Sequence, residues 1–174
     1  MKHAGPLEIE VKLRIPSTGQ LRPMLEAAGF VLGHPAAVEA NELWDRAGEL
    51  LAGDCALRLR RYGAAAILTW KGPKVADPQL KIRPELETGV ADPAAMEGIL
   101  RALGYAPVLA MVKTRSIHVR GGLEASLDDT PFGSFLELEG EPADIGAAMA
   151  ELGLGPDQIE PRSYAALYAG RSGD

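Results

Sequence analysis

Charged residues alternate with apolar residues in several short segments of this chain of 174 residues, beginning with Glu8-x-Glu10-x-Lys12. Successive side chains of a β-strand point to opposite faces, so each segment would carry its charges on one face and its apolar residues on the other. The cations placed in this way are Lys12, Arg58, Arg60, Lys71, Arg83, Lys113 and Arg115. The anions placed in this way are Glu8, Glu10, Glu85, Glu87, Asp128, Glu137 and Glu139.

Residues of like charge stand next to one another on these faces, which bears on what they bind. Arg58 and Arg60 form one such pair, and Glu8 and Glu10 form another. Neighbouring like charges repel, so clustering becomes favourable when a bound partner neutralises each cluster. Paired carboxylates suit Mg²⁺ or Mn²⁺, which prefer oxygen ligands, and clustered arginines and lysines suit phosphate. The two kinds of cluster together predict a site for a polyphosphate that is carried with its metal ions.

The same alternation predicts the strands that must position these side chains. We expect strands over residues 7–15, 38–45, 56–62, 66–71, 80–89, 108–120, 123–129 and 134–141. Apolar residues at helical spacing predict helices over residues 20–29, 92–104 and 143–152, with a short one over 163–168. The first helix is expected to start near Gln20, because that start leaves Pro23 inside the first turn. Pro84 predicts an edge position, a bulge or another irregularity in its strand.

The predicted helices indicate which way the charged faces point. Each helix has one apolar face, which must cover apolar surface. If the helices cover the outer face of a curled sheet, the charged faces point into its lumen. We therefore expect an α+β fold in which residues 1–174 form one domain, a β-barrel with a charged interior flanked by helices. The alternative is an antiparallel sheet with one solvated face on which the charges form ion pairs.

Composition narrows the class of partner. The formal net charge is −6 and the sequence pI is about 5.1, which argues against nucleic acid or an anionic membrane as the partner, since polyanion binding usually needs a basic face. A small anionic ligand is compatible with this charge, because it responds only to local charge. The single cysteine, Cys55, cannot form an internal disulfide, and no apolar run has the length of a membrane helix. We expect a cytoplasmic protein.

The ordered set of charged motifs resembles the signature of the CYTH superfamily, the triphosphate tunnel metalloenzymes. The resemblance begins at Glu8-x-Glu10-x-Lys12 and continues in the family's order to Glu137-x-Glu139, so it covers nearly the whole chain. It implies a closed eight-stranded antiparallel tunnel that binds a triphosphate and a divalent metal, Mg²⁺ or Mn²⁺. The Thr-x-Lys-Gly-Pro motif that ends at Pro73, and the short single-domain length, look most like the class IV adenylyl cyclase-type members.

The resemblance also implies a role for each motif residue. Glu8, Glu10 and Lys12 would be catalytic, and the seven cations named above would bind the substrate. The metal ligands would be Glu8, Glu10, Asp128, Glu137 and Glu139. Glu85 and Glu87 would support the site, although Pro84 departs from the family's usual polar residue and leaves the aim of Glu85 open. Ser163 and Tyr164 resemble a C-terminal element of the family, in which Tyr164 would close one end of the tunnel; the alternative is that they only pack a surface helix. The family also suggests a homodimer.

Three functions agree with these features. The first is a metal-dependent adenylyl cyclase that converts ATP to cyclic AMP and pyrophosphate. The second is a triphosphatase that hydrolyses inorganic tripolyphosphate or an organic triphosphate such as thiamine triphosphate. The third is a non-catalytic sensor of polyphosphate, against which the carboxylates argue, because simple anion binding does not need them.

Overall fold

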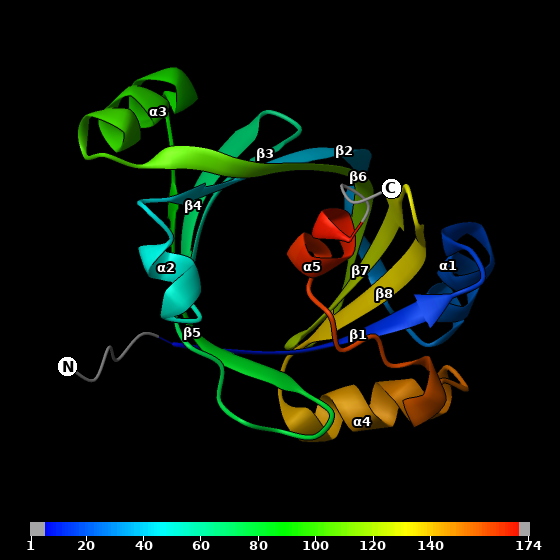
Figure 1. Cartoon of the computed structure of the whole chain (residues 1–174). Helices are drawn as coiled ribbons and strands as arrows, with labels where there is room; N and C mark the ends of the chain where they lie inside the picture. Colours follow the sequence, from blue (N-terminus) through cyan, green and yellow to red (C-terminus); the bar gives the residue numbers. More distant parts are fainter. Residues whose placement is uncertain (1–5, 171–174) are drawn as a thin grey trace.

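The computed structural model describes residues 6–170, and its eight strands form a closed antiparallel barrel in the order β1-β5-β4-β3-β2-β6-β7-β8. The last strand, β8, pairs with β1 and so closes the ring that Figure 1 shows. The strands are β1 (Leu7–Ile15), β2 (Val31–Asp45), β3 (Ala56–Tyr62), β4 (Ala65–Lys71), β5 (Lys81–Gly89), β6 (Ala106–Arg120), β7 (Leu123–Thr130) and β8 (Gly133–Glu139). The α+β barrel predicted from the sequence is confirmed.

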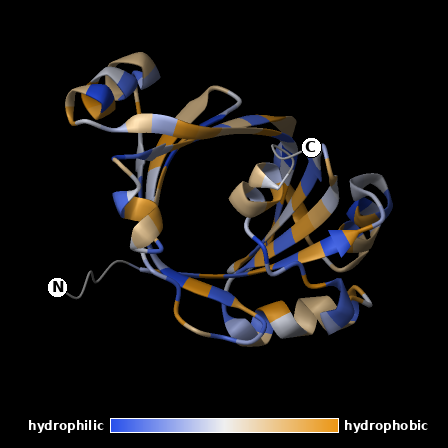
Figure 2. Ribbon diagram, in the orientation of Figure 1, coloured by the Kyte–Doolittle hydropathy of each residue, from blue (hydrophilic) through white to orange (hydrophobic). Residues whose placement is uncertain are grey.

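Helices lie outside this barrel, apart from the last one. They are α1 (Thr18–Ala27), α2 (Glu49–Ala52), α3 (Pro93–Ala102), α4 (Pro142–Glu151) and α5 (Tyr164–Ala169), with a 3₁₀ turn η1 (Pro156–Gln158). The apolar faces of α1 and α4 pack on the outer faces of β1, β7 and β8, where Leu13, Leu136 and Leu138 are fully buried. Helix α3 covers a second cluster formed by Trp44, Leu59 and Leu100, which belongs to β2, β3 and the helix itself. Figure 2 shows apolar and polar residues alternating along the strands. The covered outer face leaves the charged face to the lumen.

Three local predictions need correction. Helix α1 starts at Thr18 and not near Gln20, because the Ser17 hydroxyl accepts a hydrogen bond of 3.2 Å from the Gln20 amide and caps the helix; Pro23 is accommodated further along. Strand β2 starts at Val31 and not at residue 38, with register shifts around His34 where the strand absorbs Gly33 and Pro35. The sequence pattern predicts no helix between β2 and β3, but this segment contains the four-residue helix α2.

Pro84 lies at a junction inside β5. Strand β5 pairs with β4 as far as the pair Lys71–Glu85, and with β1 from the pair Leu7–Pro84 onward. The carbonyl oxygen of Pro84 accepts a hydrogen bond of 2.8 Å from the amide of Gly72. Neither pairing shows a register shift at Pro84, so no bulge is seen there, and Pro84 lies where the partner strand changes.

No helix within residues 6–170 combines the length and the apolar composition that crossing a membrane would require.

Candidate active site

A cavity of about 310 Å³ lies inside the barrel, and residues from all eight strands and from α5 line it. Every site residue predicted from the sequence lines this cavity except Asp128. The barrel therefore brings together side chains that the sequence spreads over 132 positions, from Glu8 to Glu139, by the period of two along each strand. The sequence reasoning missed further polar lining residues, namely Glu39, Asn41, Lys81, Glu124 and Ser126.

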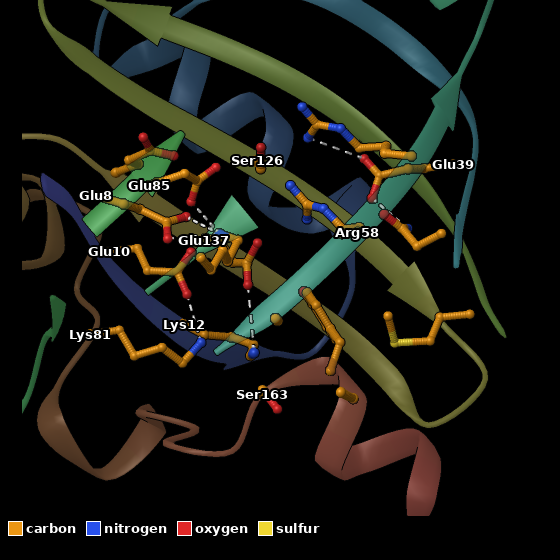
Figure 3. Close-up of a pocket in the computed structure, with 18 of the residues that line it drawn as sticks. Glu8, Glu10, Lys12, Glu39, Arg58, Lys81, Glu85, Ser126, Glu137 and Ser163 are labelled. Carbon is orange, nitrogen blue, oxygen red and sulfur yellow. Dashed lines mark hydrogen bonds and ion pairs between the residues drawn. The ribbon is translucent and has the colours of Figure 1, made fainter. Parts of the chain in front are cut away.

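The carboxylates gather on one side of the cavity, where Figure 3 shows Glu8, Glu10 and Glu85 together. The Lys71 ammonium lies 2.6 Å from a carboxylate oxygen of Glu8 and 2.6 Å from one of Glu85. The Lys81 ammonium lies 2.6 Å from Glu10. Burial raises the pKa of Glu8, and Lys71 offsets only part of this effect. The lysines hold the carboxylates in place but do not fully compensate their charge.

Glu139 lies near several other carboxylates of the cavity. Partial desolvation and the neighbouring carboxylates of Glu8, Glu124 and Glu10 raise the pKa of Glu139 to about 7. Carboxylates pressed together in this way supply the hard oxygen donors that Mg²⁺ and Mn²⁺ prefer. Among residues 6–170, no three acidic, histidine or cysteine side chains already converge as a metal site. The donor types therefore fit a divalent cation, which would compete with Lys71 and Lys81 for the same oxygens.

Further cations line the cavity, and several of their nitrogen atoms are buried without a hydrogen-bond partner. These atoms are Nζ of Lys12 and Nε of both Arg58 and Arg60. Burial lowers the pKa of Lys12 to about 8, although Glu137 opposes the shift from 3.5 Å away. A buried cationic donor without a hydrogen-bond partner is costly, so an acceptor such as a bound anion would stabilise these groups.

Asp128 and Glu137 anchor the cations of β6. The Asp128 carboxylate is fully buried and accepts hydrogen bonds from Arg115, from the Lys113 ammonium at 2.9 Å and from the Tyr164 hydroxyl at 2.6 Å. Arg115 also bonds Glu137. Asp128 shares the lumen face of β7 with Glu124 and Ser126, but its hydrogen-bond partners cover it, and it orients them toward the cavity.

Glu39 adds a buried anion on β2 that the sequence analysis did not single out. It is fully buried, and its oxygens lie 3.4 Å from the Lys113 ammonium and 3.7 Å from Nε of Arg115. Burial would raise its pKa, but Arg115 and Lys113 outweigh burial and lower the pKa to about 2. Glu39 stays ionised and helps to hold the β6 cations. Its alternation with Asn41 is visible in the sequence, but neither residue forms a pair of like charges with a neighbour.

Arg83 lies in the cavity wall but directs its guanidinium at the backbone. Its Nε donates a hydrogen bond of 2.8 Å to the carbonyl of Gly72, and Nη2 donates one of 2.8 Å to the carbonyl of Asp54. These bonds tie the end of β4 to the loop before β3. The observed contacts of Arg83 are those of a clamp between loops.

The C-terminal segment brings Tyr164 into the cavity. The Glu160 amide donates to the carbonyl of Lys12 at 2.8 Å, and the Glu160 carboxylate accepts hydrogen bonds from Arg14 and Arg162. The segment then enters α5, whose first residue is Tyr164. The Tyr164 ring centroid lies 4.0 Å from Nζ of Lys12 and 4.2 Å from Nζ of Lys113. Tyr164 thus contacts two of the predicted phosphate-binding lysines.

The structure thus shows a closed antiparallel tunnel whose cavity is lined by both carboxylates and cations. The sequence matches the CYTH domain over residues 6–164. A protein of Methanocaldococcus jannaschii named "Putative adenylate cyclase" is 30% identical over 172 residues, which covers 92% of this chain and 98% of that protein. The chain belongs to the CYTH domain family.

Two solved structures have the same fold. A "putative adenylate cyclase" from Vibrio parahaemolyticus superposes with a TM-score of 0.86 at 20% identity, over 95% of this chain and 99% of that one. A protein from Hippeastrum, named as an adenylyl cyclase and described as having a dominant triphosphatase activity, superposes with a TM-score of 0.69 at 23% identity, over 94% and 96% of the two chains. At these identities the likeness shows the tunnel fold alone.

Proposed function

We propose that this protein is a divalent-metal-dependent enzyme that processes a triphosphate in its tunnel, most nearly as a class IV adenylyl cyclase that forms cyclic AMP and pyrophosphate from ATP. One observation carries the proposal. Buried nitrogen atoms of Lys12, Arg58 and Arg60 have no hydrogen-bond partner and share one cavity with a cluster of carboxylates. A triphosphate complexed with a divalent cation would satisfy both sets of groups.

The carboxylates favour an enzyme over a simple anion sensor. Carboxylates beside a phosphate site weaken anion binding unless a cation lies between them, as Coulomb repulsion requires. Burial, together with the nearby carboxylates of Glu8, Glu124 and Glu10, raises the pKa of Glu139, and a bound cation would relieve the repulsion among these carboxylates. A metal-dependent reaction gives these residues a use that passive binding of an anion would not.

Different residues have different roles in the proposed reaction. Arg58, Arg60 and Lys113 would hold the non-bridging phosphate oxygens and fix the triphosphate along the tunnel. Glu8, Glu10 and Glu139 would hold Mg²⁺ or Mn²⁺, because Glu139 lies beside Glu10 in the β1–β8 pairing, and the ion would displace Lys71 from Glu8 and Lys81 from Glu10. The metal would neutralise phosphate charge and polarise the phosphorus–oxygen bonds. In cyclisation, the ribose 3′-hydroxyl oxygen attacks the α-phosphorus, the hydroxyl proton is transferred to a base, and pyrophosphate is the leaving group.

Hydrolysis of a triphosphate is the second candidate. The same cradle would serve a water molecule that attacks the terminal phosphorus, and the two reactions differ in which phosphorus faces the attacking oxygen. The Hippeastrum protein, which shares the fold, combines a cyclase name with a dominant triphosphatase activity. The fold therefore accommodates both descriptions.

Product analysis separates the functions. The purified protein is incubated with Mg²⁺ or Mn²⁺ and either ATP or tripolyphosphate, and cyclic AMP, pyrophosphate and orthophosphate are quantified. Cyclic AMP with equimolar pyrophosphate supports the cyclase, and orthophosphate without cyclic AMP supports the triphosphatase. Glu10→Gln serves as the control, since it should lose the metal-dependent activity. Tight binding of the triphosphate without formation of any product would support the non-catalytic sensor.

A further inference from the structure

The cavity wall contains an acceptor that a phosphate cannot satisfy. Asn41 is 4% exposed and lines the cavity, and its side-chain oxygen Oδ1 is buried without a hydrogen-bond partner. An unpaired buried polar atom costs free energy, so each one in a native structure requires an explanation.

The orientation of the Asn41 amide follows from its neighbour. Its Nδ2 donates a hydrogen bond of 2.9 Å to Oε1 of Glu39. Glu39 is ionised and can only accept, so the amide nitrogen must face it. The amide oxygen Oδ1 therefore points away from Glu39. A flipped amide would place two acceptors against each other, and the position of Oδ1 is therefore determined by chemistry.

The lining around Asn41 combines charged and apolar residues, and its cross-strand neighbour on β3 is Arg60. Met111 lies opposite Asn41 in the β2–β6 pairing, and Leu43 is the next residue along β2 on the same face. Ala56 and Ala165 are further uncharged residues of the cavity lining. Apolar side chains beside a polyphosphate site do not strengthen the binding of phosphate, but they bury the apolar surface of an organic group.

We propose that Asn41, with Met111 and Leu43, forms the part of the tunnel that receives the organic group of a nucleoside triphosphate, and that Asn41 Oδ1 accepts a hydrogen bond from it. This inference rests on the proposed function and narrows its substrate. Ionised phosphate oxygens only accept hydrogen bonds, so tripolyphosphate leaves Oδ1 unpaired. A nucleoside offers ribose hydroxyls and the amino group of its base as donors. Asn41 is then a specificity-determining residue that favours organic over inorganic triphosphate.

The test compares ligands with and without the donor. Calorimetric titrations, in EDTA and again with Mg²⁺, measure the affinity of the wild type and of Asn41→Leu for ATP and for tripolyphosphate. We expect Asn41→Leu to weaken ATP binding about tenfold, the scale of one hydrogen bond, and to leave tripolyphosphate binding unchanged. Asn41→Ala is the second variant, and bound tripolyphosphate reports that each variant retains a folded tunnel. Ser126→Ala is the matched control, because Ser126 is a buried polar residue of the same lining whose hydroxyl already bonds Glu124.

Two analogues identify the donor. 2′,3′-Dideoxy-ATP lacks the ribose hydroxyls, and purine riboside triphosphate lacks the amino group of the base. Asn41 would accept a hydrogen bond from one of these donor groups. The analogue that lacks this group should bind to the wild type and to Asn41→Leu with equal affinity. Full sensitivity of both analogues to the substitution would overturn the proposal. Equal losses for ATP and tripolyphosphate would also overturn it and would assign Asn41 to positioning its cross-strand neighbour Arg60. Absence of binding by every triphosphate to the wild type would instead refute the proposed function itself.

Discussion

The Tyr164 hydroxyl donates a hydrogen bond of 2.6 Å to Oδ2 of Asp128, a fully buried carboxylate of β7. This bond fixes the first residue of α5 in the tunnel, where the Tyr164 ring lies close to the ammonium groups of Lys12 and Lys113. The C-terminal segment thereby helps to place two cations of the cavity. The strength of this connection can be measured.

Substitution of Tyr164 separates its ring from its hydroxyl. We expect Tyr164→Ala to raise the KM for the triphosphate about tenfold, because a contact between a cation and an aromatic ring contributes about 1 kcal/mol or more when desolvated. Tyr164→Phe keeps the ring and should raise the KM less than Tyr164→Ala does. Tyr168→Phe is the control on the same helix, since the Tyr168 hydroxyl bonds the backbone of Val112. Equal effects of Tyr164→Phe and Tyr164→Ala would show that the hydroxyl matters and the ring does not.

Arg58 and Arg83 should behave differently although both line the cavity. Arg58 has a buried Nε without a partner, so Arg58→Ala should raise the KM or Kd for the triphosphate about tenfold or more, with little change in the unfolding midpoint. Arg83 bonds the carbonyls of Gly72 and Asp54, so Arg83→Ala should lower the free energy of unfolding by about 2 kcal/mol. Steady-state kinetics and chemical denaturation distinguish the two. Unchanged triphosphate binding by Arg58→Ala would remove Arg58 from the phosphate cradle.

Glu139 should destabilise the metal-free protein at alkaline pH. Its pKa is raised to about 7, above the ordinary value of 4.5. The destabilisation therefore develops as the pH rises from 4.5 to about 7, and it is complete at alkaline pH. In EDTA, Glu139→Gln should be more stable than the wild type at pH 8, by up to about 1 kcal/mol because the side chain is partly exposed and screened. The difference should vanish near pH 4. Mg²⁺ should raise the unfolding midpoint of the wild type more than that of the variant.

A surface carboxylate provides the comparison for this experiment. Glu49→Gln removes a charge from an exposed ion pair with Arg46, away from the cavity, and should respond to Mg²⁺ as the wild type does. An equal response of all three proteins to Mg²⁺ would count against Glu139 as part of the metal site.

Glu160 should stabilise the protein at neutral pH and lose this effect in acid. Hydrogen bonds from Arg162 and Arg14 outweigh burial and lower the pKa of Glu160 to about 2, below its ordinary value of 4.5. A lowered carboxylate pKa contributes stability above the unfolded value, and this contribution is lost as the pH falls toward 2. Glu160→Gln should cost about 2 kcal/mol of unfolding free energy at pH 7. Urea denaturation at pH 7 and at pH 3 should show the cost shrinking in acid, and a constant cost would contradict the account.

Much of the fold and most of the site could be predicted from the sequence, because a strand period of two assigns each side chain to a face. The pairs beginning at Glu8, Arg58 and Glu137 therefore identified lumen-facing residues before any strand pairing was known. Glu39 and Asn41 follow the same period, but one anion beside one amide lacks the like-charge clustering that marked the other strands. Helix α2 has only four residues, too few to show a helical repeat.

Contacts between distant segments could not be predicted in this way. The bonds from Arg83 to two backbone carbonyls depend on how the loops after β4 and before β3 meet, and no local pattern encodes that meeting. The bond between Arg14 and Glu160 joins residues 146 positions apart. Such contacts determine whether a charged residue faces a ligand or supports the barrel wall. Residue type and spacing alone therefore predict the same role for Arg83 and Asp128 as for the charged residues near them.

The most direct test of the central claim is a crystal structure of the protein soaked with Mn²⁺ and a non-hydrolysable ATP analogue, with the metal located by its anomalous scattering. We predict phosphate oxygens within hydrogen-bond distance of Arg58, Arg60 and Lys113, and manganese between these phosphates and the carboxylates of Glu8, Glu10 and Glu139. Phosphates bound outside the barrel, or manganese with no ligand from these carboxylates, would contradict the account.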